Sequence, residues 1–119
     1  MEYKDVENNI YLIARDFAIR IIKLYSYLYD EKREYIMSKQ IFKSGTSIGA
    51  NVFEGRNAQS RADFSSKMNI ALKEATETLY WLDLLHTTQY INDAQFESLN
   101  NDGNRILATL IKIVKATKP

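Results

Sequence analysis

Apolar side chains recur every three or four residues along four segments of the chain, and no proline interrupts any of them. The only proline is Pro119, the last residue, so the strongest helix-breaking signal is missing from the interior. Such spacing places the apolar side chains on one stripe of an α-helix. The segment of residues 5–29 shows it clearly: Ile10, Ile13, Ala14, Phe17, Ile21, Leu24 and Leu28.

The pattern predicts amphipathic helices over residues 5–29, from about 34 to 54, over 61–88, and from 93 onward. Short connections join them, and no segment shows the period-two pattern of a strand. Four such helices bury their stripes most simply in an antiparallel up-down-up-down bundle. Since 119 residues is the size of one domain, we predict an all-α protein whose residues 1–119 form a single four-helix-bundle domain.

Polar residues mark the expected helix ends. Ser60 is a candidate N-cap with Asp63 three residues later, and Asn92 with Gln95 repeats that spacing. Ile91 and Phe96 are placed to form a hydrophobic staple around the second of these caps. At the C-terminus of the second helix, we expect Gly55 to take the left-handed conformation just past the helix end.

The stretch "KSGTSIGANVFEG", residues 43–55, holds three of the four glycines. A phosphate-binding loop is not expected, because only three residues separate Gly45 from Gly49 and no Lys-Ser/Thr pair or preceding strand accompanies them. On helical spacing both glycines fall on the apolar stripe, where they let a neighbouring helix approach closely. We expect bulky partners on the facing helix, and the candidates are Phe64, Met68 and Leu72.

The composition excludes several classes of function. The absence of cysteine removes disulfides, thiolate metal sites and thiol nucleophiles. Charged residues interrupt every apolar run before it reaches the roughly 20 residues of a membrane span, and no secretory signal pattern is visible. We expect a soluble cytoplasmic protein without a membrane partner. A net charge of +1 means that any binding of nucleic acid must depend on a local concentration of charge.

Such a concentration occurs between residues 39 and 73. The basic residues there are Lys39, Lys43, Arg56, Arg61, Lys67 and Lys73, against the acidic Glu54 and Asp63. The first five are candidate nucleic-acid contacts on a surface that an oligomer would repeat. The alternative is a solvated helix face that serves solubility. A second group, Lys112, Lys115 and Lys118, is explained in large part by the dipole of the fourth helix.

Two polar residues accompany the glycine stripe. Asn51 and Glu54 are candidates for a hydrogen-bond network between helices or subunits, and the alternative is a solvent-facing turn. A carboxylate near a helix C-terminus is unfavourable with respect to the macrodipole. A basic partner such as Arg56, Arg61 or Lys67 would therefore account for Glu54.

Catalytic and metal-binding patterns are weak. His86 is the only histidine, and Asp83 lies three residues before it, but a di-iron bundle needs two such histidines and further inward glutamates. We expect His86 at a helix end or interface, with no metal and no cofactor. Ser44, Thr46 and Ser47 lie far from His86 in the predicted bundle, so we expect no enzymatic activity and no catalytic residues.

Apolar surface exceeds what four inward stripes require. Tyr80 and Trp81 lie beside the stripe of the third helix, and the first helix carries a further set: Leu12, Ile19, Ile22, Tyr25 and Tyr29. Aromatic side chains are enriched in the cores of protein interfaces. The surplus favours a homo-oligomer, and the alternative is a monomer with tyrosines on its surface.

Two stretches carry a family resemblance: "FKSGTSIGANVFEG", residues 42–55, and "SRADFSSKMNIALKEATETLYWLDLL", residues 60–85. They resemble the four-helix-bundle family named after proteins encoded in intervening sequences of bacterial 23S ribosomal RNA genes. The resemblance implies a cytoplasmic bacterial protein that assembles into a homopentamer. A related accessory protein of diversity-generating retroelements forms a similar pentameric barrel and works with reverse transcriptase and nucleic acid. The sequence departs from the family pattern at Val52 and Phe53, and in its near-neutral charge.

Two functions follow as hypotheses. The first is a non-enzymatic oligomeric binding protein that contacts RNA or other nucleic acid through a basic surface repeated by symmetry. The second is a protein–protein interaction scaffold that never touches nucleic acid. A third reading, a bundle that handles a small molecule or metal, would require a polar internal cavity.

Overall fold

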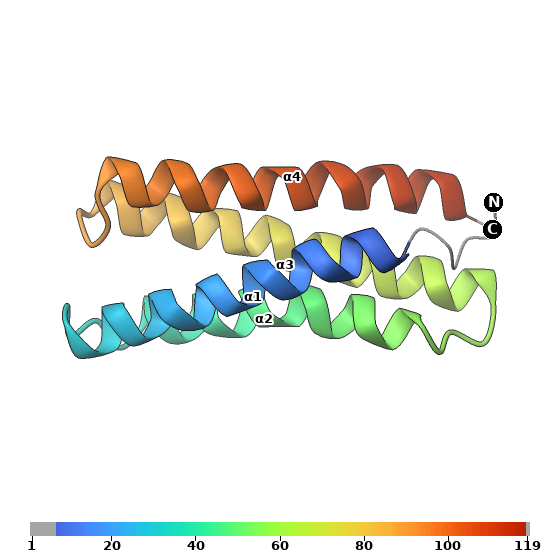
Figure 1. Ribbon diagram of the computed structural model, residues 1–119, viewed down its shortest axis with the longest axis horizontal. Helices are drawn as coiled ribbons and strands as arrows, with labels where there is room; N and C mark the ends of the chain where they lie inside the picture. Colours follow the sequence, from blue (N-terminus) through green and yellow to red (C-terminus); the bar gives the residue numbers. More distant parts are fainter. Residues whose placement is uncertain (1–6, 119) are drawn as a thin grey trace.

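The computed structural model describes residues 7–118, and side chains from residue 9 onward. Within them the chain forms helices and no strand: α1 (Glu7–Asp30), α2 (Met37–Gly55), α3 (Arg61–Thr87) and α4 (Asp93–Thr117). The helices run side by side in an elongated body of 44 × 20 × 18 Å (Figure 1). The predicted all-α four-helix bundle is confirmed. None of the four helices combines the length and apolarity that a membrane crossing requires.

The helices are arranged in chain order around the bundle axis. α2 packs between α1 and α3, and α3 packs between α2 and α4, whereas α1 and α4 touch each other much less. α1 and α3 therefore lie diagonally across the bundle. Short connections make consecutive helices antiparallel, so the start of α1, the end of α4 and the α2–α3 connection share one end (Figure 1).

One buried stripe from each helix forms the core. The stripes meet along the axis, and their largest fully buried side chains include Phe17, Ile21 and Leu28 of α1, Ile41 and Ile48 of α2, Phe64, Met68 and Leu82 of α3, and Ile106 and Leu110 of α4. These positions follow the three-and-four spacing that predicted the helices. Because burial of this apolar surface is the main driving force for folding, the pattern determines which face of each helix turns inward.

The predicted caps of α3 and α4 are confirmed. Ser60 Oγ accepts a hydrogen bond of 3.0 Å from the backbone N–H of Asp63. At α4, Asn92 and Gln95 form a complete capping box, each side chain accepting a hydrogen bond of 2.8 Å from the other's backbone N–H. Both caps satisfy N–H groups that a helix cannot pair internally.

The N-terminus of α2 has a cap that sequence analysis missed. Glu34 is buried, and its carboxylate accepts hydrogen bonds from the backbone N–H groups of Ile36, Met37 and Ser38 at 3.2, 3.0 and 2.7 Å. Ser38 Oγ donates back to the carbonyl of Glu34 at 2.7 Å. A carboxylate at this position also interacts favourably with the helix dipole. Glu34, the last residue of the connector "DEKRE" (residues 30–34), therefore determines where α2 begins.

The prediction that Gly55 adopts a left-handed conformation is wrong. Gly55 is the last residue of α2, and no glycine among residues 7–118 has a positive φ; the left-handed residues there are Arg33 and Gln89. The chain leaves α2 through tight turns, in which Asn57 N–H donates to Glu54 O and Ala58 N–H donates to Gly55 O. A Cβ on Gly55 would lie 2.7 Å from Met68 Cε, so this glycine allows α3 to pack closely.

Gly45 and Gly49 are buried as predicted, but they face a different helix. A Cβ on Gly45 would lie 2.8 Å from the side chain of Ile21, and one on Gly49 would lie 3.6 Å from the carbonyl oxygen of Ala14. Both partners belong to α1. The predicted partners Phe64, Met68 and Leu72 belong to α3 and are not among the nearest atoms to either glycine.

The reason for this difference lies on the other side of α2. The side of α2 that faces α3 carries Ser44, which accepts a hydrogen bond of 2.9 Å from Thr78 Oγ1 of α3. Both residues are fully buried, and Thr78 Oγ1 also lies 2.8 Å from the carbonyl oxygen of Glu74. A paired hydroxyl is compatible with burial. On this side of α2, Ser44 therefore contributes a polar contact to α3, whereas Gly45 and Gly49 face α1.

Candidate nucleic-acid interface

The basic residues predicted to contact nucleic acid separate into two groups. Lys39 and Lys43 lie in the first half of α2 and are exposed, whereas Arg56, Arg61 and Lys67 lie at or beyond its far end. With a rise of about 1.5 Å per residue, the two groups are separated by roughly 20 Å along the bundle. The five residues therefore do not form one surface.

Arg61, the first residue of α3, joins that helix to the end of α4. Its Nη2 donates a hydrogen bond of 2.7 Å to the carbonyl of Ala116 in the last turn of α4. The carbonyls of a final helical turn have no partner within the helix, so the guanidinium satisfies one of them. The contact brings Arg61 into the neighbourhood of the α4 lysines, which are more than fifty residues away along the chain.

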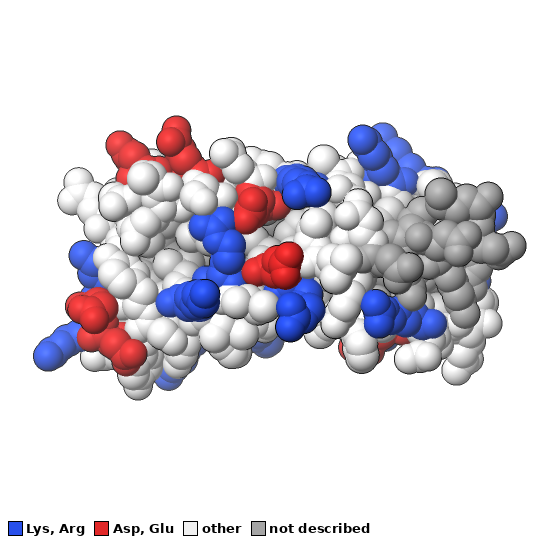
Figure 2. All heavy atoms as spheres, viewed as in Figure 1, with Lys and Arg blue, Asp and Glu red and all other residues white. Residues whose placement is uncertain are grey.

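We call the resulting cluster the basic end, and it consists of Arg56, Arg61, Lys67, Lys112, Lys115 and Lys118. Among side chains that the structure describes, the acidic residues in this region are Glu54 and Asp63. In Figure 2, basic side chains border the described part of this end, on the right, while most acidic ones on that face lie in the middle or at the left. The long axis of the bundle therefore carries an asymmetric charge.

Arg56 and Lys67 are held by neighbouring side chains. The guanidinium carbon of Arg56 lies 4.1 Å from the ring centroid of Tyr11 in α1 and 5.5 Å from that of Phe53 in α2. Lys67 Nζ lies 3.3 Å from Glu54 Oε1, which links α3 to α2. Arg56 and Lys67 therefore contribute positive charge to the basic end, and their side chains also make contacts within the protein.

The lysines of α4 are placed differently. Lys112, Lys115 and Lys118 are exposed, and no residue within 7–118 forms an ion pair with them. From Gly103 to Lys118 the sequence has no acidic residue at all. Sequence analysis assigned this group to the helix dipole, and the structure adds that it lies beside Arg61.

The expected network of Asn51 and Glu54 is present only in part. Glu54 pairs with Lys67, one of the three basic partners that were considered. Asn51, in contrast, donates a hydrogen bond of 2.8 Å to the carbonyl of Ser47 within its own helix. Between the helices of one copy, the contact that the described residues show for this pair is therefore that of Glu54 with Lys67.

The opposite end of the bundle is acidic and holds His86. The acidic residues there are Asp30, Glu31, Glu34, Asp83, Asp93 and Glu97, with the basic residues Lys32, Arg33 and Lys39 among them. His86 Nε2 lies 2.7 Å from Asp93 Oδ1, and the imidazole stacks on Phe96 at 4.2 Å with an interplanar angle of 9°. His86 thus joins the end of α3 to the start of α4, the helix-end position expected for it.

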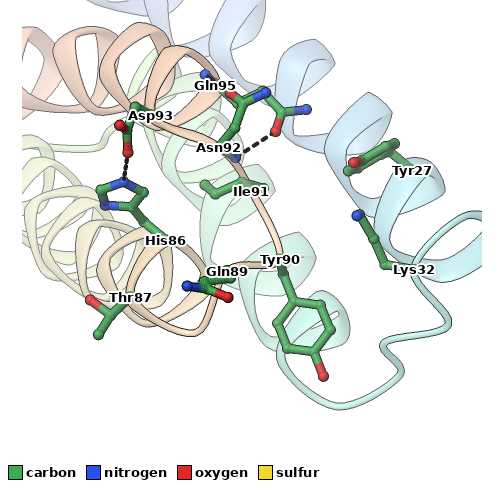
Figure 3. Close-up of a pocket in the computed structure, with 10 residues that line it drawn as sticks. All are labelled: Tyr27, Lys32, His86, Thr87, Gln89, Tyr90, Ile91, Asn92, Asp93 and Gln95. Atoms are coloured by element: carbon green, nitrogen blue, oxygen red, sulfur yellow. Dashed lines mark hydrogen bonds and ion pairs between the residues drawn. The ribbon is translucent and has the colours of Figure 1, made fainter.

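A hollow of about 480 Å³ opens beside this histidine, between the two connections. Tyr27 and Lys32 line one side and Tyr90 another, while the side chains of Asn92, Gln95 and His86 are engaged in the bonds already described (Figure 3). Among residues 7–118, no three His, Asp or Glu side chains come close enough to hold a metal ion. The hollow is therefore an open depression at the bundle end.

Besides Tyr35, Ile36 and Ile111, large apolar side chains are exposed on two sides of the described part of the molecule. We call the first the α1–α2 face; its exposed residues are Leu12, Ile19, Ile22, Tyr29, Phe42 and Phe53. Half-buried Tyr25 connects it through ring contacts of 5.7 Å to Tyr29 and 5.0 Å to Phe42. We call the second the α3 face; it consists of exposed Ile70 and Tyr80 with half-buried Trp81, whose ring lies 5.1 Å from that of Tyr80.

Comparison with known proteins places the chain in a family. Residues 6–112 match the family described as 23S rRNA-intervening sequence protein. No curated protein matches the chain. A crystal structure of a protein of unknown function from the S23 ribosomal protein family of Bacteroides thetaiotaomicron VPI-5482 is 55% identical, with a TM-score of 0.90 over 92% of this chain and 98% of that one. The protein therefore belongs to the 23S rRNA-intervening sequence protein family.

Proposed function

We propose that the protein is a non-catalytic, cytoplasmic homo-oligomer, a pentamer by its family resemblance, that binds structured RNA through its basic end. The observation that carries the proposal is the meeting of Arg61 with the exposed lysines of α4. The phosphate groups of RNA attract such a cluster whatever the base sequence. Binding also displaces cations that are condensed on the RNA backbone, and their release favours the complex.

The composition of the basic end supports a polyanion as its ligand. Lys112 and Lys115 extend from a segment without acidic residues, and Arg61 is bonded to the last turn of α4. A guanidinium beside exposed ammonium groups suits a backbone in which phosphates repeat at intervals. Because a single copy offers only a few contacts, repetition of the basic end in an oligomer would raise the overall affinity.

The first experiment is a salt titration of RNA binding. The wild-type protein is mixed with a fluorescent RNA hairpin, and the dissociation constant is measured by anisotropy between about 50 and 200 mM salt. If several phosphates are neutralised, the logarithm of the binding constant should fall linearly with the logarithm of the salt concentration. The expected slope is about −0.7 to −0.9 for each phosphate contacted. Binding that is absent, or that does not depend on salt, would contradict the proposal.

Two double variants locate the binding surface. Lys112→Glu/Lys115→Glu reverses two charges of the basic end, and Lys39→Glu/Lys43→Glu makes the same change in net charge on α2. We expect the α4 variant to lose RNA binding and the α2 variant to retain most of it. Equal loss in both would show that only the total charge matters, and the basic end would then not be the site.

The second candidate function is a protein–protein scaffold, and the exposed α1–α2 and α3 faces favour it. Large exposed apolar patches are uncommon on monomeric proteins, and where they occur they often mark interaction surfaces. The two candidates differ in their dependence on salt, because apolar contacts do not weaken as salt rises. An oligomer that shows no affinity for RNA would leave the scaffold as the better account.

A further inference from the structure

We propose that the seam between α1 and α4 binds an amphiphilic monocarboxylate, a straight hydrocarbon chain that ends in one carboxylate group. The site is a hollow of about 400 Å³, which we call the seam groove; its lining consists of Arg20, Lys23, Leu24, Tyr27, Gln95 and Leu99. The inference goes beyond the proposed function, because the seam groove includes no residue of the basic end and takes a ligand of a different class.

The first support is the loose packing of this seam. α1 and α4 touch each other much less than consecutive helices do. Tyr27 and Gln95, which come from opposite sides of the seam, line both the seam groove and the depression at the bundle end (Figure 3). The groove is therefore continuous with that open depression. A hollow of this volume between the helices of a bundle is large enough to hold a small molecule.

The second support is an apolar floor of suitable length. Leu24 of α1 is 7% exposed and Leu99 of α4 is 5% exposed, so their side chains lie at the base of the groove. On α1 the lining extends from Arg20 to Tyr27, which is roughly 10 Å along the helix axis. The extended chain of octanoate has a similar length. Its methylene groups would replace water above the two leucines, which is favourable for apolar surface.

The third support is the charge of the lining. Arg20 and Lys23 line the groove, and no acidic residue of the described chain does so. Asp102 pairs with Arg20, whereas Lys23 is exposed and forms no ion pair within residues 7–118. Asp30 and Glu97 are exposed and lie outside the lining, so water and salt screen their charges. A carboxylate beside Lys23 would supply the missing opposite charge.

The hollow on the other side of the Arg20 ion pair provides a contrast. Its volume is about 140 Å³, and its lining includes two carboxylates, those of Asp16 and Asp102, with one cation, Arg105. An anionic ligand would meet like charges there and would have little room. The size and the charge of the two hollows therefore both assign the monocarboxylate to the seam groove.

The main test is a calorimetric titration of the wild-type protein with octanoate. Octylammonium has the same hydrocarbon chain and the opposite charge, and we expect it to bind more than about tenfold more weakly. Lengthening the probe from hexanoate to octanoate should raise the affinity about fourfold, which corresponds to half-burial of the two added methylene groups. Absence of octanoate binding, or equal affinity for the two octyl probes, would overturn the proposal.

An amide NMR spectrum of the wild-type protein determines where octanoate binds. The largest changes in chemical shift should occur in residues 20–27 of α1 and 95–99 of α4. The exposed α1–α2 face is the competing apolar surface on the described part of the molecule. Changes that are largest around Leu12 or Phe53 would overturn the assignment to the seam groove, even if calorimetry detects binding.

Two variants with the same change in net charge provide a matched control. Lys23→Glu places a carboxylate in the lining of the groove, whereas Lys73→Glu places one on the exposed side of α3, diagonally across the bundle from α1. We expect Lys23→Glu to weaken octanoate binding more than about tenfold and Lys73→Glu to change it less than about twofold. Circular dichroism verifies that both variants are folded. Equal effects of the two substitutions would contradict the role of Lys23.

Discussion

α1 has two neighbours, and it is held to them in different ways. Against α2 the backbones come close, because Gly45 and Gly49 face Ile21 and Ala14 without side chains of their own. Against α4 the contacts are few, and the long side chain of Arg20 spans the gap. Its Nη1 lies 2.6 Å from Asp102 Oδ2, and its Nη2 donates a hydrogen bond of 2.8 Å to Ser98 Oγ.

Hollows flank this polar bridge on both sides. One of about 400 Å³ lies towards Tyr27 and Leu99, and one of about 140 Å³ lies towards Ile13 and Ile106. The α1–α2 seam is therefore closed by packing and the α1–α4 seam by a partly exposed ion pair. An exposed pair contributes about 0.2–1 kcal/mol, whereas disturbing a packed seam costs about 1–3 kcal/mol. The comparison indicates that the bundle opens more readily between α1 and α4.

Filling the closed seam should have the largest effect. Gly45→Leu and Gly49→Leu would each place a branched side chain where α1 already lies, and overpacking of this kind costs about 1–3 kcal/mol or more. We expect a lower free energy of unfolding in chemical denaturation and a thermal midpoint reduced by several degrees. Unchanged denaturation curves for both variants would show that the two helices are not closely packed there.

The two alanine variants should differ in sign within the same seam. A Cβ on Gly45 would come within 2.8 Å of Ile21, a buried and β-branched side chain that has little freedom to move, so Gly45→Ala should destabilise. A Cβ on Gly49 would make only ordinary contacts, at 3.6 Å or more. Gly49→Ala should therefore stabilise by up to about 0.8–1 kcal/mol, the difference in helix propensity. Denaturation of both variants side by side measures the contrast, and equal effects would remove it.

Breaking the bridge of the open seam should cost less. Asp102→Asn removes the ion pair with Arg20 and leaves the hydrogen bond from Arg20 to Ser98. The side chain of Arg20 is 38% exposed and that of Asp102 is 47% exposed. The expected loss is about 0.2–1 kcal/mol, and it should decrease as salt is added. Glu97→Gln on the same helix is the control, because Glu97 forms no ion pair among residues 7–118. A larger loss than in the glycine variants would reverse the comparison.

The smallest expected effect concerns the α2–α3 seam and depends on pH. Burial and the charge of Glu77 raise the pKa of Glu74 above 4.5 in the folded protein. The folded state therefore holds the proton more tightly than the unfolded state does, and stability falls as the pH rises from about 4.5 through the raised pKa. Glu74→Gln lacks this loss, so its stability relative to wild type should increase over that interval and then level off. A constant difference at all pH values would contradict the shift.

The sequence was sufficient for features determined by local chemistry. The spacing of apolar residues predicted the helices, and the side chains of Ser60, Asn92 and Gln95 cap them as expected. The cap by Glu34 was missed, because its carboxylate reaches forward into α2 from an irregular connector, where no spacing rule applies.

Features that depend on how helices face each other were predicted less well. Periodicity showed that Gly45 and Gly49 point inward, but it could not identify α1 as their partner, since the inner stripe of α2 meets two helices. The basic end was missed for a similar reason, because Arg61 and Lys115 are distant in sequence and become neighbours only through antiparallel packing. An up-down topology applied to the positions of the charges would have predicted that proximity.

The even number of helices also determines where the molecule can be labelled. The first and last described residues lie at the same end of the bundle, where Arg61 is bonded to the last turn of α4 (Figure 1). In the proposed complex, a fluorescent protein attached at either terminus would compete with RNA for space. A small dye on a cysteine introduced at Gln89, which is exposed at the far end of a 44 Å body, would report binding without obstructing it.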